Sequence, residues 1–296
     1  MNCTVGYTSP FVPPEWISAH GLVPRRLQLR RASGPVNAGV CPFAAAIAER
    51  GQQMGEAEAL VLTSTCDQMR RIIEHMDGNS FRVFLMDVPA TWQTTESQAL
   101  YVDELHRLGR FMCRLGGRPC EKSRLANAMR EYDERRRAER AMRGEVNPYG
   151  RVPLALVGGA LRKQDAWLFE CIDQSGGWVA LDATESGQRT LPAAFDSARV
   201  NEDPIGELAR AYFGTIPDVF RRPDTLLHEY LHQQIQSRGV RGILLVRYVW
   251  CDQWHAQFQR IKEATGLPAI EVDLGDQDQD LQRTRTRIES LIGILQ

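Results

Sequence analysis

Short runs of apolar, β-branched residues alternate along the chain with longer segments of helical periodicity. Near-continuous apolar runs are typical of strands in parallel sheets that helices cover on both faces. The alternation therefore predicts an α/β fold with parallel sheets. The clearest predicted strands are Ala59–Thr63, Arg82–Met86, Pro153–Val157, Val179–Asp182, Gly242–Tyr248 and Ala269–Val272.

A long charged segment, Glu121–Arg143, lies between the two groups of strands and contains no proline or glycine. It predicts a solvated helix that joins two domains. Its arginines are interleaved with acidic residues, and such a mixed face is typical of a solvated helix rather than of a nucleic-acid-binding surface. We expect an N-terminal domain over residues 1–120, a connecting helix over 121–148 and a C-terminal domain over 149–296.

The order of residues repeats weakly between the two halves, which indicates an internal duplication. In the first half a strand leads to Cys66–Gln68 (CDQ), a helix, a second strand and Asp87. In the second half a strand leads to Cys251–Gln253 (CDQ), a helix, a second strand and Asp273. Ligands of open α/β sheets bind beyond the carboxyl ends of the strands, where both cysteines stand. Two similar domains facing each other would bring the two turns together.

Composition and charge limit the partners and the cellular location that can be expected for this chain. Hydrophobic residues make up 43% of the 296 residues, which is enough for a sizeable core. The net charge of −1 creates no overall field that would attract nucleic acid or an anionic membrane. The N-terminus lacks the pattern of a secretory signal, and no apolar stretch is long enough to span a bilayer. We therefore expect a cytoplasmic protein without nucleic-acid or membrane partners, whose seven cysteines are thiols or metal ligands.

Three of these cysteines stand at predicted helix starts. Cys66 and Cys251 each follow a strand and precede a helix, and Cys41 precedes Pro42 and an Ala-rich helix. The helix dipole and the backbone N–H groups at such positions favour the thiolate, which is the form that binds iron. Four thiolates are usual for a cubane, so three would leave one iron open. The hypothesis is an iron–sulfur cluster held by Cys41, Cys66 and Cys251 between the two domains.

Two other interpretations of these cysteines stay open. Isolated cysteines without a CxxC pattern are often buried small hydrophobes. A zinc site is the second alternative, because His255 stands one helical turn after Cys251. The remaining cysteines have no partner pattern and are expected to be structural, namely Cys3, Cys113, Cys120 and Cys171.

No catalytic side chain is assigned beside the open iron, and Ser64 is the one candidate hydroxyl. Ser64 and Thr65 precede Cys66 and could form hydrogen bonds near the cluster, and Trp250 and Trp254 beside Cys251 could screen it from solvent. Plain packing is an equally good interpretation of all four side chains.

Nearly the whole chain carries a series of short motifs around these cysteines. They are Gly6-Tyr7, Pro13-Pro14-Glu15, Ala19-His20-Gly21-Leu22-Val23-Pro24, Cys41-Pro42-Phe43, Ser64-Thr65-Cys66-Asp67, Asp87-Val88-Pro89, Tyr101-Val102-Asp103-Glu104-Leu105, Gly187-Gln188-Arg189, Ala209-Arg210-Ala211-Tyr212, Cys251-Asp252, Gly266-Leu267-Pro268 and Thr284-Arg285-Thr286-Arg287-Ile288-Glu289. As an ordered set, they resemble the 2-hydroxyacyl-CoA dehydratase and benzoyl-CoA reductase family, and within it the D-component of 2-hydroxyglutaryl-CoA dehydratase.

The resemblance implies two Rossmann-like domains with a [4Fe–4S] cluster between them, on the cysteines that match Cys41, Cys66 and Cys251. It also implies a related second subunit and an ATP-hydrolysing activator that carries its own cluster. One low-potential electron from the activator would pass through the cluster to the thioester carbonyl of an acyl-CoA substrate. In the dehydratases, the resulting ketyl radical expels the 2-hydroxyl group.

This chain is shorter than typical members of that family, so part of the acyl-CoA pocket could be missing. Two alternative functions therefore stay open beside a 2-hydroxyacyl-CoA dehydratase (a lyase) or an aryl-CoA reductase (an oxidoreductase). One is a reductase of a small non-CoA molecule with a double-cubane cluster. The other is a non-catalytic subunit that relays electrons. The partner subunit could be a related chain or a second copy of this one.

Overall fold

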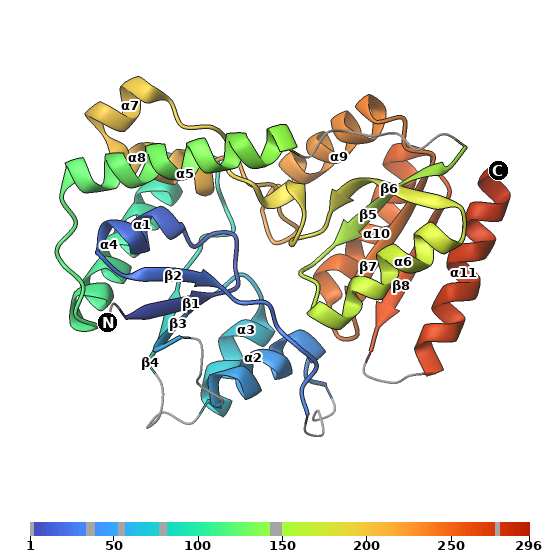
Figure 1. The fold of residues 1–296 in the computed structure, drawn as a ribbon, viewed down its shortest axis with the longest axis horizontal. Helices are drawn as coiled ribbons and strands as arrows, with labels where there is room; N and C mark the ends of the chain where they lie inside the picture. Colours follow the sequence, from blue (N-terminus) through green and yellow to red (C-terminus); the bar gives the residue numbers. More distant parts are fainter. Residues whose placement is uncertain (1–2, 34–38, 53–56, 77–81, 143–149, 276–278) are drawn as a thin grey trace.

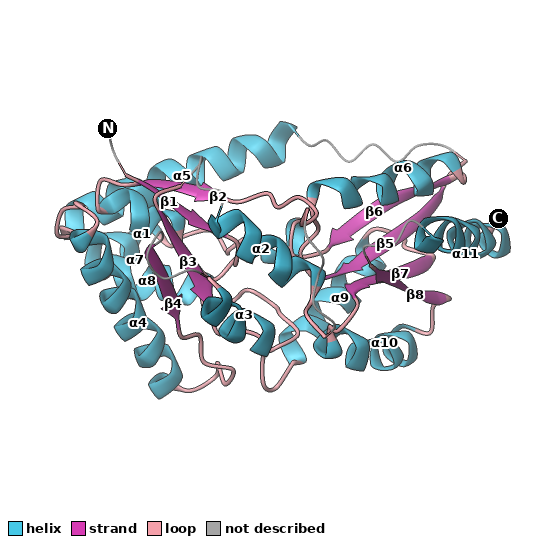
Figure 2. Ribbon diagram, turned by 90° about the horizontal axis from the view of Figure 1, so that it is seen from below, coloured by secondary structure: helices cyan, strands magenta, loops and turns pink. Residues whose placement is uncertain are grey.

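The computed structural model describes residues 3–33, 39–52, 57–76, 82–142, 150–275 and 279–296. It confirms the α/β prediction, with two four-stranded sheets whose strands all run parallel and whose faces are covered by helices (Figures 1 and 2). The strand order is β2-β1-β3-β4 in the first sheet and β6-β5-β7-β8 in the second. The two orders are the same when each half is numbered from its own first strand, so the duplication extends to the topology.

The strands are β1 (Thr4–Tyr7), β2 (Val23–Arg26), β3 (Ala59–Thr63), β4 (Arg82–Met86), β5 (Val152–Gly158), β6 (Gly177–Ala183), β7 (Gly242–Tyr248) and β8 (Ala269–Leu274). The helices are α1 (Pro14–Ala19), α2 (Pro42–Gln52), α3 (Asp67–Ile72), α4 (Thr95–Arg114), α5 (Lys122–Met142), α6 (Trp167–Gln174), α7 (Ser197–Glu202), α8 (Pro204–Tyr212), α9 (Thr225–Ser237), α10 (Asp252–Thr265) and α11 (Gln279–Leu295). Short 3₁₀ turns lie at Ile73–His75, Lys163–Ala166 and Gln188–Thr190.

All six strands predicted from the apolar runs are present, to within two residues at each end. The prediction missed β1 and β2. β1 is only four residues long, and β2 is an exposed edge strand of sequence VPRR. Proline and arginine are common on edge strands, where no neighbour needs the missing N–H group and where charge discourages pairing with another chain. Such a strand has no apolar run by which it could be recognised.

Both faces of the first sheet are buried, because alternate residues of its strands contribute apolar side chains to two different cores. Val5 and Val61 point into a core shared with α1, α4 and α5, whereas Leu60 and Leu62 point to the opposite face with α2 and α3. Side chains of successive strand residues point to opposite faces, so an all-apolar strand such as β3 serves both cores. The core under α2 and α3 continues into the second sheet, since the same cluster contains side chains of β5 and β7.

Helix α5 confirms the long predicted helix, but the expectation that it is simply solvated is wrong. Leu125, Ala126 and Met129 are buried, and α5 packs along α1. These apolar side chains stand in its first half, so one face of that half joins the core of the first sheet. The end of the predicted connecting helix, residues 143–148, lies outside the described residues.

Helices α7 and α8 come from the second half of the chain but pack with α4 and α5 on the first sheet (Figure 1). All strands of the first sheet lie in residues 1–120, and all strands of the second sheet lie in residues 149–296. That these two ranges form separate domains stays a prediction. In the described ranges, no helix has the length and apolar character that a bilayer crossing requires.

Candidate functional site

The turns that carry Cys66 and Cys251 occupy matching places in the two sheets. Cys66 follows β3 and is the N-cap residue of α3, and the backbone N–H of Met69 points at its Sγ with an N···S distance of 3.4 Å. Cys251 follows β7 and is the N-cap residue of α10. Cys41 directly precedes α2 and is buried. All three cysteines thus stand at helix starts, as the sequence predicts.

Hydrogen bonds from two glutamine side chains join the three turns. Gln68 Nε2 donates to the carbonyl of Gly39, and Gln68 Oε1 accepts from the backbone N–H of Cys41, both at 3.1 Å. Gln253 Nε2 donates to the carbonyl of Thr65 at 3.1 Å. The structure therefore brings together three segments that are far apart in the sequence, at the carboxyl ends of strands from both sheets.

Charge interactions also link the three thiols, although burial has the largest effect on the pKa values of Cys66 and Cys251. Burial raises the pKa of Cys66 to about 11, and negative charge on Cys41 contributes to the rise. Burial raises the pKa of Cys251 to about 12, and charge on Cys41 and on Cys66 adds to it. None of the seven cysteines is in a disulfide bond. The expectation that the helix starts favour thiolates is wrong for the metal-free protein, because the loss of hydration outweighs the N–H groups.

The three thiols do not form a ready-made site for a single metal ion. In the part of the chain that the structure describes, no group of three or more His, Cys, Asp or Glu side chains is arranged to hold a metal ion. Thiolates on one tetrahedral ion lie about 3.8 Å apart, given bonds of about 2.3 Å. Thiolates of a cubane bind different iron atoms and stand farther apart. The cluster on Cys41, Cys66 and Cys251 therefore stays a prediction.

The zinc alternative needs His255 as a second ligand beside Cys251. The Nδ1 atom of His255 instead lies 2.9 Å from Oε1 of Glu271, and the side chain is 61% exposed. Arg247 binds the same carboxylate oxygen at 2.7 Å. His255 thus belongs to a surface ion-pair group on α10, β7 and β8.

The residues flanking the cysteines have different roles. Ser64 is buried, and its Oγ accepts from the backbone N–H of Val88 at 3.1 Å, so its hydroxyl also ties the ends of β3 and β4 together. Trp254 is buried, with the guanidinium of Arg189 over its ring. Trp250 is 56% exposed and has a left-handed φ of 71°, so it extends into solvent instead of screening Cys251.

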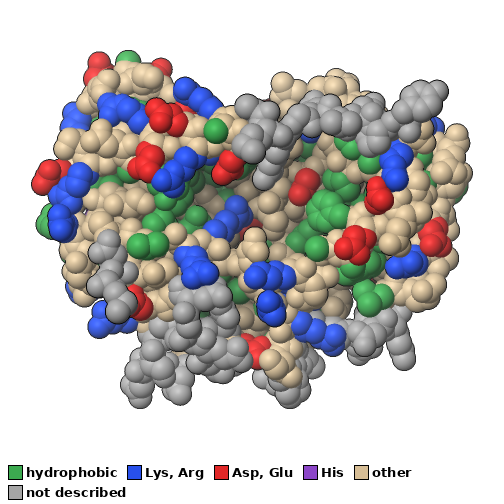
Figure 3. Space-filling view, viewed as in Figure 1, with side chains coloured by type: hydrophobic (Ala, Val, Ile, Leu, Met, Phe, Trp, Pro, Cys, Tyr) green, Lys and Arg blue, Asp and Glu red, His purple; other side chains and the backbone are tan. Residues whose placement is uncertain are grey.

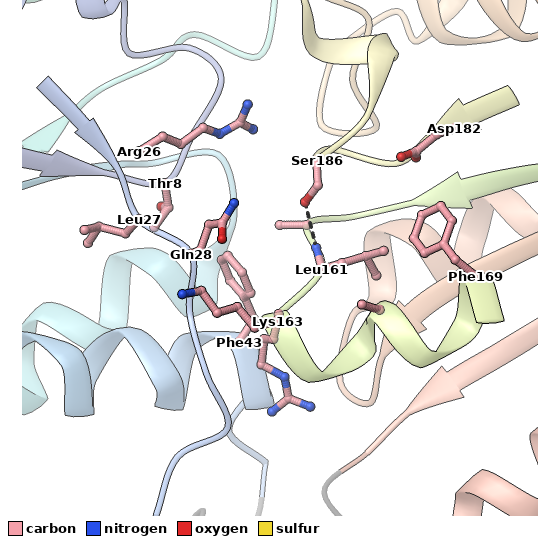
Figure 4. A pocket seen from close by; sticks show the side chains of 13 residues that line it. Thr8, Arg26, Leu27, Gln28, Phe43, Leu161, Lys163, Phe169, Asp182 and Ser186 are labelled. Atoms are coloured by element: carbon pink, nitrogen blue, oxygen red, sulfur yellow. Dashed lines mark hydrogen bonds between the residues drawn. The ribbon is translucent and has the colours of Figure 1, made fainter. Parts of the chain in front are cut away.

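A cavity of about 510 Å³ lies beside the Cys41 turn, between the two halves. Phe43, two residues after Cys41, forms part of its wall. Figure 4 shows Arg26 and Gln28 from the first half and Lys163 and Ser186 from the second on either side of the same space. On the face shown in Figure 3, Lys and Arg side chains gather along this border. The lining thus combines the positive charges of Arg26 and Lys163 with one carboxylate, Asp182.

Sequence reasoning missed Glu185, which precedes the cavity-lining Ser186 and whose charge acts on Cys66. Its backbone carbonyl accepts a hydrogen bond from Arg26 at 2.8 Å, and its charge contributes to the raised pKa of Cys66. Loss of hydration, followed by the charge of Asp218, raises the pKa of Glu185 to about 7. The sequence signal that could have identified Glu185 is its place just after a strand and ahead of the Gly187–Arg189 motif.

The cysteines expected to be structural lie elsewhere. Cys171 on α6 is buried in the core of the second sheet, and Cys113 on α4 is exposed. Cys3 and Cys120 are partly buried and pack against the core of the first half.

Comparison with protein families gives a match over most of the chain. The model of the family described as "2-hydroxyglutaryl-CoA dehydratase, D-component" matches residues 10–146 and 138–295. A search of curated proteins found no match.

Solved structures with some likeness include the Ni²⁺ complex of FpvC from P. aeruginosa, with 14% identity, coverage of 100% of this chain and 98% of that chain, and a TM-score of 0.28. Another is an S38A mutant of a Mn-bound periplasmic metal binding protein from Candidatus Liberibacter asiaticus, with 14% identity, coverage of 99% and 100%, and a TM-score of 0.27. Likeness at this level supports no conclusion about this chain.

Proposed function

Because this chain belongs to the 2-hydroxyglutaryl-CoA dehydratase D-component family, it is a component of a 2-hydroxyacyl-CoA dehydratase-type system, and we propose that it is the subunit that carries a [4Fe–4S] cluster on Cys41, Cys66 and Cys251. The proposed reaction is the ATP-activated reduction of an acyl-CoA thioester, as in a 2-hydroxyacyl-CoA dehydratase or an aryl-CoA reductase. When bound, the cluster would supply one low-potential electron at a time and an open iron.

The convergence of the three cysteine turns is the observation that carries this proposal. Cys41, Cys66 and Cys251 come from separate helix starts, interact electrostatically and lie where the strands of both sheets end. Buried thiols that raise one another's pKa gain from a cationic partner, since metal coordination deprotonates a thiol and compensates the charge. A core packing role alone gives no reason to gather three thiols from distant segments where strands of both sheets end.

The adjoining cavity supports an acyl-CoA as the substrate. Arg26 and Lys163 present positive charge from opposite sides, which suits the phosphates of a CoA ester. Phe43 and Leu161 add apolar wall near the Cys41 turn, which suits an acyl chain. In this arrangement the chain's own residues orient the thioester and keep water away from it.

The partners belong to the same proposal. They are an ATP-dependent activator protein with its own cluster, and either a related second subunit or a second copy of this chain. The proposed location is the cytoplasm, where a low-potential cluster is protected under anaerobic conditions.

An anaerobic spectroscopic titration tests the function. The cluster-loaded protein is reduced with dithionite, and its EPR spectrum is recorded with and without 2-hydroxyglutaryl-CoA or benzoyl-CoA. We expect a thioester to shift the g values, because the substrate would lie at the open iron. CoA without an acyl group serves as the control. A signal that no thioester changes, together with no turnover when the activator is added, would contradict an acyl-CoA function.

A further inference from the structure

Gln68 binds the Cys41 turn with both ends of its side-chain amide. Its Nε2 donates to Gly39 O and its Oε1 accepts from Cys41 N–H, each at 3.1 Å. The amide thus pairs with the backbone around Cys41 as a strand would. Because Gln68 stands two residues after Cys66, this pairing fixes the Cys41 turn against the Cys66 turn.

Gln253 connects the same Cys66 turn to the other sheet. Its Nε2 donates to the carbonyl of Thr65, the residue before Cys66, at 3.1 Å. Gln253 stands two residues after Cys251, so the two glutamines occupy the same position in the duplicated Cys-Asp-Gln turn. Each reaches to the turn of another cysteine.

The intervening aspartates behave differently. Asp67 and Asp252 are exposed, whereas Gln68 and Gln253 are partly buried between the turns. A glutamine can donate and accept without adding charge, so it can connect backbone groups without placing a charge beside the buried thiols. A carboxylate at the same place could not donate to the carbonyl of Thr65.

We propose that Gln68 and Gln253 are positioning residues that hold the turns of Cys41, Cys66 and Cys251 at a fixed spacing, with Gln253 setting that spacing across the two sheets. The part of the inference that is tested on iron-loaded protein rests on the proposed function. The hydrogen bonds exist without metal, so a first experiment tests the inference on the metal-free protein and distinguishes its failure from failure of the proposed function.

That experiment measures the alkylation rate of each cysteine in metal-free protein by mass spectrometry under argon. Gln253→Leu should speed alkylation of Cys66 and Cys251 about three- to tenfold, the range expected from the loss of one neutral hydrogen bond. Gln68→Leu should do the same for Cys41. The buried Cys171 reports global loosening, and Gln259→Leu on the exposed face of α10 is the matched control.

Unchanged rates in both variants would overturn the inference. It would also be overturned if the alkylation rate of Cys171 rose as much as the rates of the other three thiols, because the glutamines would then act on overall stability alone. Acceleration confined to the three site cysteines supports it.

A second experiment uses the cluster-loaded protein and removes the hydrogen bond without adding charge. Gln253→Met has nearly the same length as glutamine and is neutral, but it cannot donate to Thr65 O. We expect Gln253→Met to shift the g values and the reduction potential and to speed iron loss about tenfold, as is typical for residues that orient metal ligands, and Gln259→Met on the exposed face of α10 to change none of these. Wild-type spectra and iron retention in Gln253→Met would contradict the role of Gln253. If the wild-type protein takes up no iron, the proposed function fails, and the alkylation rates still decide the inference.

Discussion

At the scale of single residues, burial reverses the pKa shift that the sequence alone suggests for a cysteine at a helix start. Cys66 stands at a helix start, where an N–H group favours the thiolate, yet burial raises the pKa of its thiol to about 11. The position of the thiol could be predicted from the order of strand, cysteine and helix. The sign of the pKa shift could not, because the desolvation depends on packing between segments distant in the chain.

Glu185 gives a pH-dependent prediction. Its pKa rises from 4.5 to about 7 in the folded protein, so folding favours the protonated carboxyl. The resulting stabilisation is fully present below about pH 4.5 and is lost as the pH rises through 7. We expect the free energy of unfolding of the wild-type protein to fall between pH 5 and 8 relative to that of Glu185→Gln, as measured by urea titration. Parallel pH profiles would contradict the shift. Glu229→Gln, an exposed change on α9, is the control.

Lys163 gives a prediction for ligand binding. Lys163→Ala removes a positive charge from the cavity and should weaken binding of an acyl-CoA to the metal-free protein about tenfold, or about 1.4 kcal/mol. Isothermal titration calorimetry at low and high salt measures this, and the difference between the proteins should shrink with salt. The exposed Lys262 on α10 provides the control, Lys262→Ala. Equal affinities of Lys163→Ala and wild type would place the ligand elsewhere.

At the scale of elements, a buried ionic group joins α1, α5 and α8. Glu15 on α1 is fully buried, and its carboxylate binds Arg136 of α5 at 2.6 Å and the hydroxyl of Tyr212 on α8 at 2.7 Å. The charge pattern of α5 predicted the helix correctly. It did not predict this contact, because Arg136 looks like its exposed neighbours in the sequence and Glu15 lies 121 residues away along the chain.

Arg135 and Arg136 are neighbours on α5, so substituting each in turn compares an exposed ion pair with a buried one. Arg136→Ala leaves Glu15 as an unpaired buried charge and should lower the free energy of unfolding by about 3–5 kcal/mol. Arg135 pairs with Glu131 on the surface, where both side chains are more than half exposed, so Arg135→Ala should cost less than about 1 kcal/mol. Urea unfolding measures both. Similar losses in the two variants would show that the buried group does not stabilise the packing of these helices.

At the scale of the whole molecule, the duplication is the feature that the sequence predicted best. The repeated order of strand, Cys-Asp-Gln turn and helix correctly indicated two parallel sheets, which have the same strand order. The exposed edge strand β2 and the return of α7 and α8 to the first sheet were not predicted. Neither depends on a local pattern, since β2 is an exposed edge strand and the helices pack on a sheet from the other half of the chain.

The central claim is that the three converging cysteines hold one iron–sulfur cluster. The most direct measurement is the iron and acid-labile sulfide content per chain after anaerobic reconstitution of the wild type, Cys41→Ser, Cys66→Ser, Cys251→Ser and the exposed control Cys113→Ser. We predict about four iron and four sulfide in the wild type and in Cys113→Ser, and the loss of most of both in the other three variants. Less than about one iron in the wild type, or a full complement in any of the three site variants, would contradict the claim.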